Sequence, residues 1–400
     1  MKSLATGFKL LLALFALSTV PAFTQTDMTD SATTAATAPV AYVYVGAANK
    51  VNLYDAAANG KLTLVKGSPF QTSGLTIGSN GKFLVTLGTN LIHSYPVVST
   101  GAIGKQISTI NTQFFSGSDC SDDGTGGAVL DHTGTNLYVY FFTEFNDGGT
   151  TGGGCASIQT YNISKAGELS FNGAALFGNN AGNGIDQIPA ITGNDTYAYA
   201  SGYFGIGGDP SQQEVYGFKR KSGGELEDWN PNVTPPSASA GGIYLPGFIT
   251  ADPANHLAIS TQAFYYDGDN FQYGPLQLAS FTEDTQGNIV SSNTSENMPS
   301  PEVTPSIMNM SPSGKLLALG GNGLQVFHFN GANPITPYSS VLTTAPINQI
   351  HWDNSNHLYA LSDSTNKLYV YTITPTSISA VPGSPFTTIA NPTALVVVPK

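Results

Sequence analysis

A strand-and-turn unit recurs along this chain, and the repetition constrains the fold more than any other feature. Each unit has a polar turn rich in Asn, Asp, Ser and Gly, followed by an apolar strand. Six copies of this turn and strand lie at 77–88, 130–142, 192–203, 250–261, 310–321 and 352–363. Their spacing of roughly 40–60 residues is typical of a four-stranded propeller blade.

A seventh copy is divided between the two ends of the chain. Residues 390–400 supply an inner strand with no successor, whereas residues 41–65 supply three strands with no predecessor. Joined, these segments complete one blade and close the ring, so that no sheet edge stays open between blades. We therefore predict an all-β fold, a seven-bladed β-propeller of four-stranded blades in which the C-terminal inner strand pairs with the N-terminal strands.

The tetrapeptide Gly-Ser-Pro-Phe occurs at 67–70 and again at 383–386. Each copy follows an apolar run, at the exit of the outer strand in two adjacent blades, the first and the seventh. Gly permits a positive φ there, Pro ends the strand's hydrogen bonding, and Phe offers an apolar face to a neighbouring blade. We interpret both serines as structural and not catalytic.

The first 24 residues have the pattern of a secretory signal peptide. Two lysines come before an apolar run at 10–17, and small residues follow, with cleavage expected after Ala22 or Thr24. That run is shorter than the ~20 residues of a membrane span, and no later run reaches ~18, so we expect no transmembrane segment. Residues 25–39 are rich in Thr and Ala and predict a disordered tether before a propeller at 40–400. We expect a secreted or periplasmic protein.

The charge of the chain excludes one class of partner. Loss of two lysines with the signal peptide leaves 12 basic and 26 acidic residues, a formal net charge of −14. Such an acidic protein is a poor partner for nucleic acid. Arg220 is the sole arginine, which disfavours a phosphorylated ligand as well. We expect a monomer.

The blade pattern resembles a known family. Strands such as KLYVYTI carry apolar side chains on both faces, as strands between stacked blades must. An aromatic-rich LYV strand, a Y-x-I/Y-D strand and then G-x-L-x-x-V-x-GSPF are similar to the lactonase-like seven-bladed propellers, which include 6-phosphogluconolactonase and the YVTN-type surface repeats. The resemblance covers residues 40–400. It implies an alternative function, a lactonase-like hydrolase that acts on a small lactone. Glu302 and Asp186, which precede inner strands, are the candidate carboxylates to activate water for attack on the ring ester.

Long loops are predicted to gather on one face of the ring. Those at 144–155, 203–214 and 264–275 interrupt blades three to five. Function on a propeller concentrates in such loops, so we predict a binding or scaffolding site there for a glycan or an envelope protein. The candidate ligand-binding residues are Tyr203, Tyr265, Tyr266, Gln187, Asn348 and Gln349, and Phe264, Phe271 and Tyr273 add further aromatic rings to the same rim.

Two further expectations concern these loops. Cys120 and Cys155 are the only cysteines, one before and one within blade three, and predict a disulfide in an exported chain. A metal-binding or reactive thiol pair is the alternative. Asp119, Asp122 and Asp123 have the oxygen ligands that Ca²⁺ prefers, although Asp and Gly also form ordinary turns. Ca²⁺ is the one cofactor that the sequence suggests.

The six histidines have mostly structural explanations. His132, His256 and His357 lie in or beside equivalent inner turns on the opposite face, where we expect solvated side chains. The third-strand histidines, His93 and His328, are expected to have satisfied structural roles. His351, on an inner strand, is the one histidine considered as a functional group, without an evident acidic partner.

Overall fold

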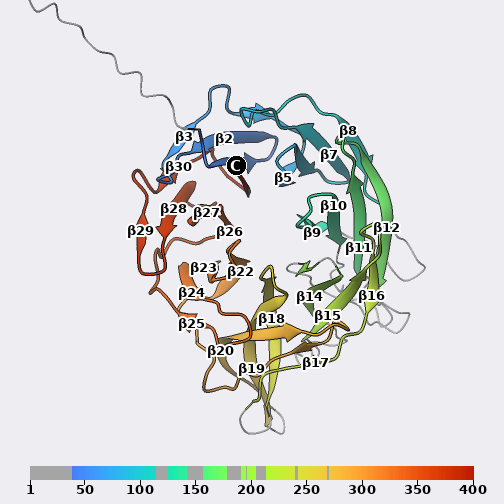
Figure 1. Cartoon of the computed structure of the whole chain (residues 1–400), viewed down its shortest axis with the longest axis vertical. Coiled ribbons are helices and arrows are strands. Elements are labelled where there is room, and N and C mark those ends of the chain that lie inside the picture. The colour runs from blue at the N-terminus through green and yellow to red at the C-terminus, as the bar shows by residue number, and fades with distance from the viewer. Residues whose placement is uncertain are drawn as a thin grey trace, which may run out of the picture. The chain divides into compact units, whose positions relative to one another are not determined.

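The computed structural model describes residues 38–113, 125–141, 156–177, 191–194, 196–203, 213–238, 242–267 and 270–400. Throughout this part of the chain the regular structure is β-strand, arranged as seven sheets in a ring around a common axis (Figure 1). None of the described elements is a helix long and apolar enough to cross a membrane. The prediction of an all-β, seven-bladed propeller is confirmed.

Each blade runs from an inner strand near the axis of the ring to an outer strand at the rim, and neighbouring strands are antiparallel except for one pair in blade 5. Blade 1 contains β31 (Ala394–Pro399), β1 (Ala41–Ala47), β2 (Lys50–Ala56), β3 (Leu62–Leu64) and β4 (Phe70–Gln71). Blade 2 contains β5 (Leu75–Ser79), β6 (Phe83–Leu87), β7 (Leu91–Pro96) and β8 (Ser108–Asn111). Blade 3 contains β9 (Thr125–Leu130), β10 (Asn136–Phe141), β11 (Ala156–Ile163) and β12 (Leu169–Phe177).

The remaining blades follow the same order, and blade 5 adds a parallel outer strand, β17. Blade 4 contains β13 (Thr192–Gly193), β14 (Tyr197–Tyr203), β15 (Gln213–Arg220) and β16 (Leu226–Trp229). Blade 5 contains β18 (Ile243–Ala251), β19 (His256–Asp267), β20 (Asn270–Glu283), β21 (Ile289–Val290) and β17 (Val233–Thr234). Blade 6 contains β22 (Pro305–Met310), β23 (Leu316–Gly321), β24 (Leu324–His328) and β25 (Thr336–Pro337). Blade 7 contains β26 (Gln349–Trp352), β27 (His357–Ser362), β28 (Lys367–Ile373), β29 (Ile378–Ala380) and β30 (Phe386–Thr387).

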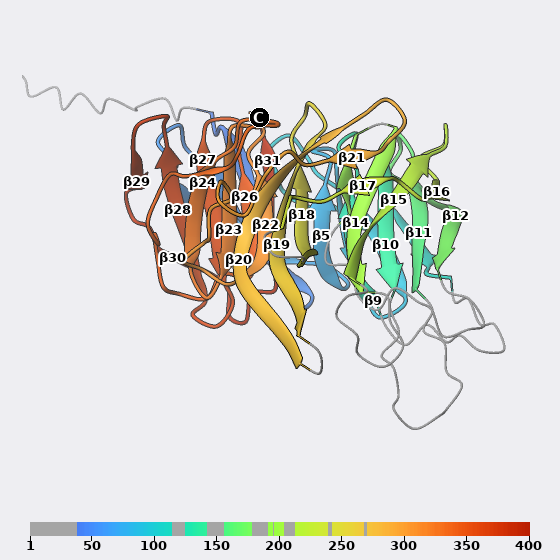
Figure 2. The ribbon, with the colours of Figure 1, turned by 90° about the horizontal axis from the view of Figure 1, so that it is seen from below.

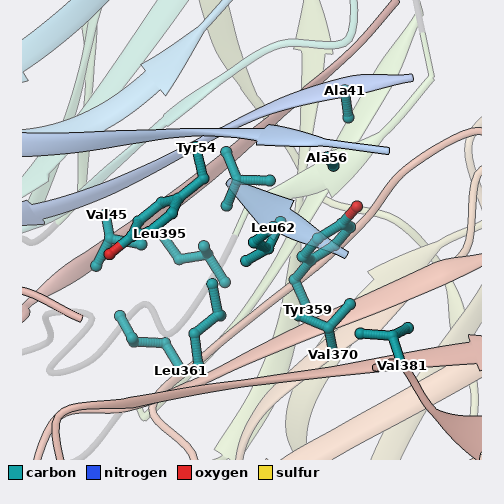
Figure 3. Close-up of a cluster of buried hydrophobic side chains, with 12 residues drawn as sticks. Ala41, Val45, Tyr54, Ala56, Leu62, Tyr359, Leu361, Val370, Val381 and Leu395 are labelled. Atoms are coloured by element: carbon teal, nitrogen blue, oxygen red, sulfur yellow. The ribbon is translucent and has the colours of Figure 1, made fainter. Parts of the chain in front are cut away.

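The two ends of the described chain close the ring in blade 1, as predicted. Strand β31 pairs antiparallel with β1, from Ala41 opposite Pro399 to Gly46 opposite Ala394. Every residue of β1 is buried, because blades 7 and 2 cover its two faces. Figure 3 shows the seam with blade 7, where Tyr54 and Leu395 of blade 1 lie beside Leu361. The chain runs from β30 of blade 7 into β31 of blade 1, so the closing contact is the noncovalent pairing of β31 with β1, supported by this apolar seam.

The turn between the inner and second strands is stabilised in the same way in six blades. A side-chain oxygen at the start of the turn accepts a hydrogen bond from a backbone amide three to five residues later, which is why Asn, Asp or Ser recurs at this position. The acceptors are Asn80, Asp131, Asn194, Asp252, Ser311 and Asp353. The recurrence of Asn, Asp or Ser in these turns therefore reflects a hydrogen bond between residues that are close in the sequence.

Successive blades are also joined by side-chain hydroxyls. Each hydroxyl lies on the second or third strand of one blade and donates to a carbonyl in the turn that precedes the outer strand of the next blade. The pairs are Tyr44 to Gly101 (2.7 Å), Tyr138 to Gly224 (2.8 Å), Tyr199 to Gly287 (2.9 Å), Ser94 to Gly167 and Ser280 to Asn333 (3.0 Å). Four of these acceptors are glycines at positive φ, a conformation that glycine adopts at little cost. The tyrosines of the repeat thus fix the blade-to-blade register.

The Gly-Ser-Pro-Phe segments have the structural role that was predicted. The Oγ atoms of Ser68 and Ser384 accept hydrogen bonds from the amides of Leu53 and Val370, at 3.1 and 2.9 Å. Both glycines have positive φ, and the two Ser-Pro bonds are cis. The following Phe starts a two-residue strand that pairs with the third strand of its own blade. Both serine hydroxyls are therefore engaged by backbone.

Candidate functional site

Among the described residues, the ends of the second strands and the starts of the third and inner strands lie at one end of the ring, here called the loop face. The inner turns lie at the other end, the turn face. In Figure 2 the turn face is uppermost, and the β19–β20 hairpin extends below its neighbours on the loop face. These two strands have 12 and 14 residues, whereas the other described strands have at most nine. This hairpin is the main described projection of the loop face.

An apolar row crosses three strands at the root of this hairpin. Ile243 of β18 lies opposite Phe264 of β19, which in turn lies opposite Tyr273 of β20. The rings of Phe264 and Tyr273 are 5.4 Å apart between centroids. Phe264 is buried, whereas Ile243 is 44% exposed and Tyr273 is 53% exposed. We call these three residues the aromatic row, and it presents an exposed apolar surface across three paired strands.

The tyrosines that were predicted for this rim differ in what surrounds them. Tyr265 is half-buried and packs against the apolar core of blades 4 and 5, with its ring close to Gly242. Tyr266 lies opposite Phe271 in the hairpin, and Tyr203 ends β14 opposite Gln213. Ile243 was not singled out from the sequence, because its place beside Phe264 depends on the strand register. The exposed surface therefore centres on Tyr273 and Ile243.

Glu302, a predicted catalytic residue, is exposed on the loop face just before β22. The buried side chain of Gln325 on β24 holds it at two points: Gln325 Oε1 accepts from the Glu302 amide at 2.8 Å, and Gln325 Nε2 donates to Glu302 Oε1 at 3.3 Å. The carboxylate is therefore oriented by a side chain that is itself fixed in the core.

Asn348 and Gln349 stand at the start of the neighbouring inner strand β26. Asn348 is exposed, and its Oδ1 accepts a hydrogen bond of 3.3 Å from the amide of Asp363. Gln349 is half-buried and lies opposite Leu361. The exposed Asn348 side chain thus also binds the backbone just after β27.

Several predicted site residues lie outside the described residues: Asp186, Gln187, Cys120, Cys155, Asp119, Asp122 and Asp123. Their roles in catalysis, ligand binding, a disulfide and a Ca²⁺ site stay predictions. Within the ranges that the structure describes, no three His, Cys, Asp or Glu side chains come together as a metal site requires.

The histidines on the turn face correct one expectation. His357 is only 1% exposed, and its Nδ1 lies 2.7 Å from Oδ2 of the buried Asp353, to which Tyr359 also donates. It is therefore a core residue and not a solvated one, because blade 1 covers this turn at the ring's seam. His256 pairs with Asp252 in the same way at 3.0 Å but is 30% exposed.

The other histidines fit structural roles. His93 Nδ1 lies 2.9 Å from the Thr109 hydroxyl, and burial lowers its pKa. The ring of His328 stacks on Tyr338 at 4.1 Å. His351 on β26 is half-buried, and burial lowers its pKa to about 4 with no contribution from a charged group. His351 is therefore a neutral imidazole at neutral pH.

A cavity of about 870 Å³ opens on the turn face, which is not where function was predicted. Inner turns of blades 3, 4, 5 and 6 surround it. Its walls include Leu130, Ile191, Tyr197, Asp252, Glu283 and Met310. Each of these residues has an ordinary place in a strand or turn, and only the curvature of the ring brings them together.

Comparison with known proteins establishes the fold alone. No protein-family model and no curated protein matches this chain. The periplasmic gluconolactonase of Pseudomonas aeruginosa is similar in structure, with a TM-score of 0.53, 13% identity, and coverage of 90% of this chain and 99% of that protein. A proposed 6-phosphogluconolactonase of Bacteroides fragilis has a TM-score of 0.53, 12% identity, and coverage of 90% and 98%. A protein of Lactobacillus plantarum has a TM-score of 0.54, 13% identity, and the same coverage.

Proposed function

We propose that this lactonase-like seven-bladed propeller is a secreted or periplasmic binding module that captures a carbohydrate or protein ligand on the loop face of blades 3–5. The observation that carries the proposal is the aromatic row, which leaves Ile243 and Tyr273 exposed beside a buried Phe264. An exposed aromatic ring on a rigid support stacks on a sugar or fits a pocket of a protein partner at small entropic cost.

The position of the sole arginine disfavours a phosphorylated ligand at the loop face. Arg220, the sole arginine, is engaged at the turn face, where its guanidinium donates to the Asn194 carbonyl (2.7 Å) and to the Tyr138 hydroxyl. It is therefore not available to bind an anionic ligand at the loop face. A neutral glycan or a protein surface fits the aromatic row better than a phosphorylated ligand does.

The test compares a double variant, Ile243→Ala with Tyr273→Ala, with Val290→Ala, which changes another exposed apolar residue of blade 5. The mature protein is applied to glycan and envelope-protein arrays. We expect the double variant to lose binding by at least ~30-fold, since truncated aromatic anchors cost about 2 kcal/mol or more. Both proteins should keep the wild-type melting temperature. Undiminished binding by the double variant would contradict the proposal.

Cleavage of the predicted signal peptide, and with it export of the protein, can be measured separately. We expect mass spectrometry of the exported protein to show an N-terminus after Ala22 or Thr24. The intact mass, with and without reduction, also tests the predicted bond between Cys120 and Cys155, which lowers the mass by two hydrogen atoms. A retained Met1 would contradict export by signal-peptide cleavage.

A second candidate is a lactone hydrolase, favoured by the exposed and oriented carboxylate of Glu302. In this reaction Glu302 accepts a proton from water, and the hydroxide adds to the lactone carbonyl carbon. The ring C–O bond then breaks, and the ring oxygen takes the proton back from Glu302 to give the hydroxy acid. The gluconolactonase name belongs to the Pseudomonas aeruginosa protein and enters here only as a guide to substrates.

The assay measures hydrolysis of unphosphorylated and phosphorylated sugar lactones, with and without Ca²⁺. If this candidate is right, the wild type opens the unphosphorylated lactone faster than buffer does, and Glu302→Gln loses at least ~100-fold of that rate. Glu296→Gln, a neutralised acid in the segment before β22, is the control. Hydrolysis rates equal to those in buffer for every lactone would contradict the lactone hydrolase function.

A further inference from the structure

A second cavity, with a volume of about 280 Å³, lies in the seam between blades 4 and 5. Blade 5 contributes the buried side chains of Tyr244 on β18, Ile259 on β19 and Phe281 on β20. Blade 4 contributes the buried Val215 near the start of β15. Residues 230–236, which connect the two blades, form the remaining wall. The cavity is therefore enclosed by two neighbouring blades and by the chain that joins them.

The connecting segment 230–236 is held in place and does not fill the cavity. It contains three prolines, which cannot donate to a strand ladder, and its strand β17 has only two residues. Pro231 packs against Gly217 of blade 4, and the carbonyl of Asn232 accepts a hydrogen bond of 3.0 Å from the amide of Ile289 in blade 5. The segment is thus fixed to both blades instead of folding into the space between them.

Hydrogen bonds also fix the spacing of the two blades. The hydroxyl of Tyr199 on β14 donates to the Gly287 carbonyl at 2.9 Å, and the hydroxyl of Ser201 on the same strand donates to the Gly247 carbonyl of β18. An unfilled apolar cavity costs stability in proportion to its volume, because its walls lack van der Waals partners. A ligand that fits this cavity would therefore supply contacts that the two blades do not make with each other.

The polar groups of the cavity lie mainly at its entrance. Glu214 and Asn230 are exposed, and Glu214 is the one charged side chain among the described residues of the lining. The buried hydroxyls are already engaged, since Thr261 donates to a backbone carbonyl at 3.0 Å and Tyr244 to a glutamine side chain at 3.1 Å. An apolar interior with a carboxylate at its entrance favours a ligand that has an apolar body and one hydrogen-bond donor.

The volume of the cavity indicates the size of that body. A dry apolar cavity of about 150 Å³ holds one benzene ring, and this cavity is nearly twice as large. The rings of Tyr244 and Phe281 in its wall favour an aromatic ligand, because aromatic rings attract one another in offset or edge-on contacts. We propose that this cavity binds a small, planar compound of two fused aromatic rings that carries a hydroxyl group, with the hydroxyl donating to the carboxylate of Glu214.

This site is separate from the aromatic row, although both use β18 and β19. Successive side chains of a strand point to opposite faces of the sheet. Tyr244 packs in the apolar cluster that blades 4 and 5 share, so Ile243 beside it lies on the other face of blade 5. The proposal therefore does not depend on the ligand of the aromatic row.

Fluorescence titration of the mature protein with 2-naphthol at pH 7.5 tests the site, with 2-naphthoate as the anionic counterpart of the same ring size. We expect 2-naphthol to bind and 2-naphthoate to bind at least tenfold more weakly, because its carboxylate meets the carboxylate of Glu214. Glu214→Gln removes the repulsion and should reduce the preference for 2-naphthol to less than threefold.

A cavity-filling variant tests the location. Val233 is a half-buried residue of the lining, so Val233→Trp fills the cavity from the connecting segment and should weaken 2-naphthol binding at least tenfold. Val290→Trp makes the same change on β21, which pairs with β17 but lies outside the lining, and should alter binding less than twofold. The double variant Ile243→Ala with Tyr273→Ala should also bind 2-naphthol within twofold of the wild type.

A measurement on the wild type keeps the test independent of how the variants fold. In NMR spectra of the complex, the ring protons of 2-naphthol should give nuclear Overhauser contacts to the methyl groups of Val215, Val233 and Ile259. Absence of 2-naphthol binding, contacts to other methyl groups only, equal affinities for the two probes, or unchanged binding by Val233→Trp would each overturn the proposal. Loss of binding in the aromatic-row double variant would also overturn it, since the probe would then occupy the aromatic row.

Discussion

Leu395 at the closing seam offers a direct test of how the ring is held together. It is 2% exposed and belongs to the apolar cluster that blades 1 and 7 share, beside Tyr54 and Leu361 (Figure 3). Truncation of a buried Leu to Ala costs about 2–5 kcal/mol, from lost transfer energy and the cavity left behind. Leu64 in the same blade is 52% exposed, so Leu64→Ala should change stability by no more than about 0.5 kcal/mol.

A truncation extends the same reasoning. Loss of residues 391–400 removes all of β31, including the buried Leu395, Val396 and Val398 and the ladder to β1. At about 1.5–3 kcal/mol for each buried aliphatic side chain, the loss approaches the ~5–15 kcal/mol that keeps a whole domain folded. We therefore expect the truncated chain to show no cooperative unfolding transition.

Urea unfolding followed by circular dichroism measures all of these variants. A chain that lacks residues 25–37 serves as the control for a shortened terminus and should keep the wild-type midpoint. If Leu395→Ala and Leu64→Ala lower the free energy of unfolding equally, or if the C-terminal truncation unfolds at the wild-type midpoint, pairing of the termini is not what holds the ring.

Three further predictions concern hydrogen bonds within and between blades. Tyr199→Phe leaves the Gly287 carbonyl without its donor and should lower the free energy of unfolding by about 1–3 kcal/mol in urea. An unchanged free energy of unfolding would mean that this hydrogen bond does not stabilise the ring. Ser384→Ala removes the acceptor of the Val370 amide and should lower stability by a similar amount without affecting ligand capture; a loss of capture in a stable variant would contradict its structural role. Burial alone would raise the pKa of Asp353, but hydrogen bonds from the adjacent imidazole, a backbone amide and a tyrosine hydroxyl outweigh it and lower the pKa. The stabilisation from the Asp353 carboxylate is therefore complete above its unfolded-state pKa of about 4 and is lost as the pH falls through its lower folded-state pKa. Asp353→Asn should flatten the plot of unfolding free energy against pH between pH 5 and pH 2. Parallel plots for the wild type and the variant would contradict this.

The sequence determined the architecture because each part of the blade is encoded locally. The turn acceptors, such as Asn80 and Asp353, bond to amides a few residues away, so their spacing alone marks each inner turn. The split seventh blade followed from counting strands at the two ends, and β31 pairs with β1 as expected. Local hydrogen bonds and strand periodicity involve residues that are close together in the chain, so the sequence alone reveals them.

The sequence also placed Glu302, Asn348 and Gln349 at the starts of inner strands on the loop face, and the structure has them there. It did not show that Gln325, 23 residues away, orients Glu302. Nor did it reveal that blade 1 buries His357, while the equivalent His256 stays 30% exposed. The two histidines have the same local pattern, and only their neighbours in the ring distinguish them.

What tertiary structure alone decided is which distant residues meet. Ile243 and Tyr273 flank Phe264 because of strand register, which a bulge between β19 and β20 shifts. Leu130 and Met310 line one cavity although they are far apart in the sequence, since the inner turns of blades 3 to 6 converge at the channel mouth. A repeat specifies the blade that each residue belongs to, but the curvature of the closed ring determines what each residue faces.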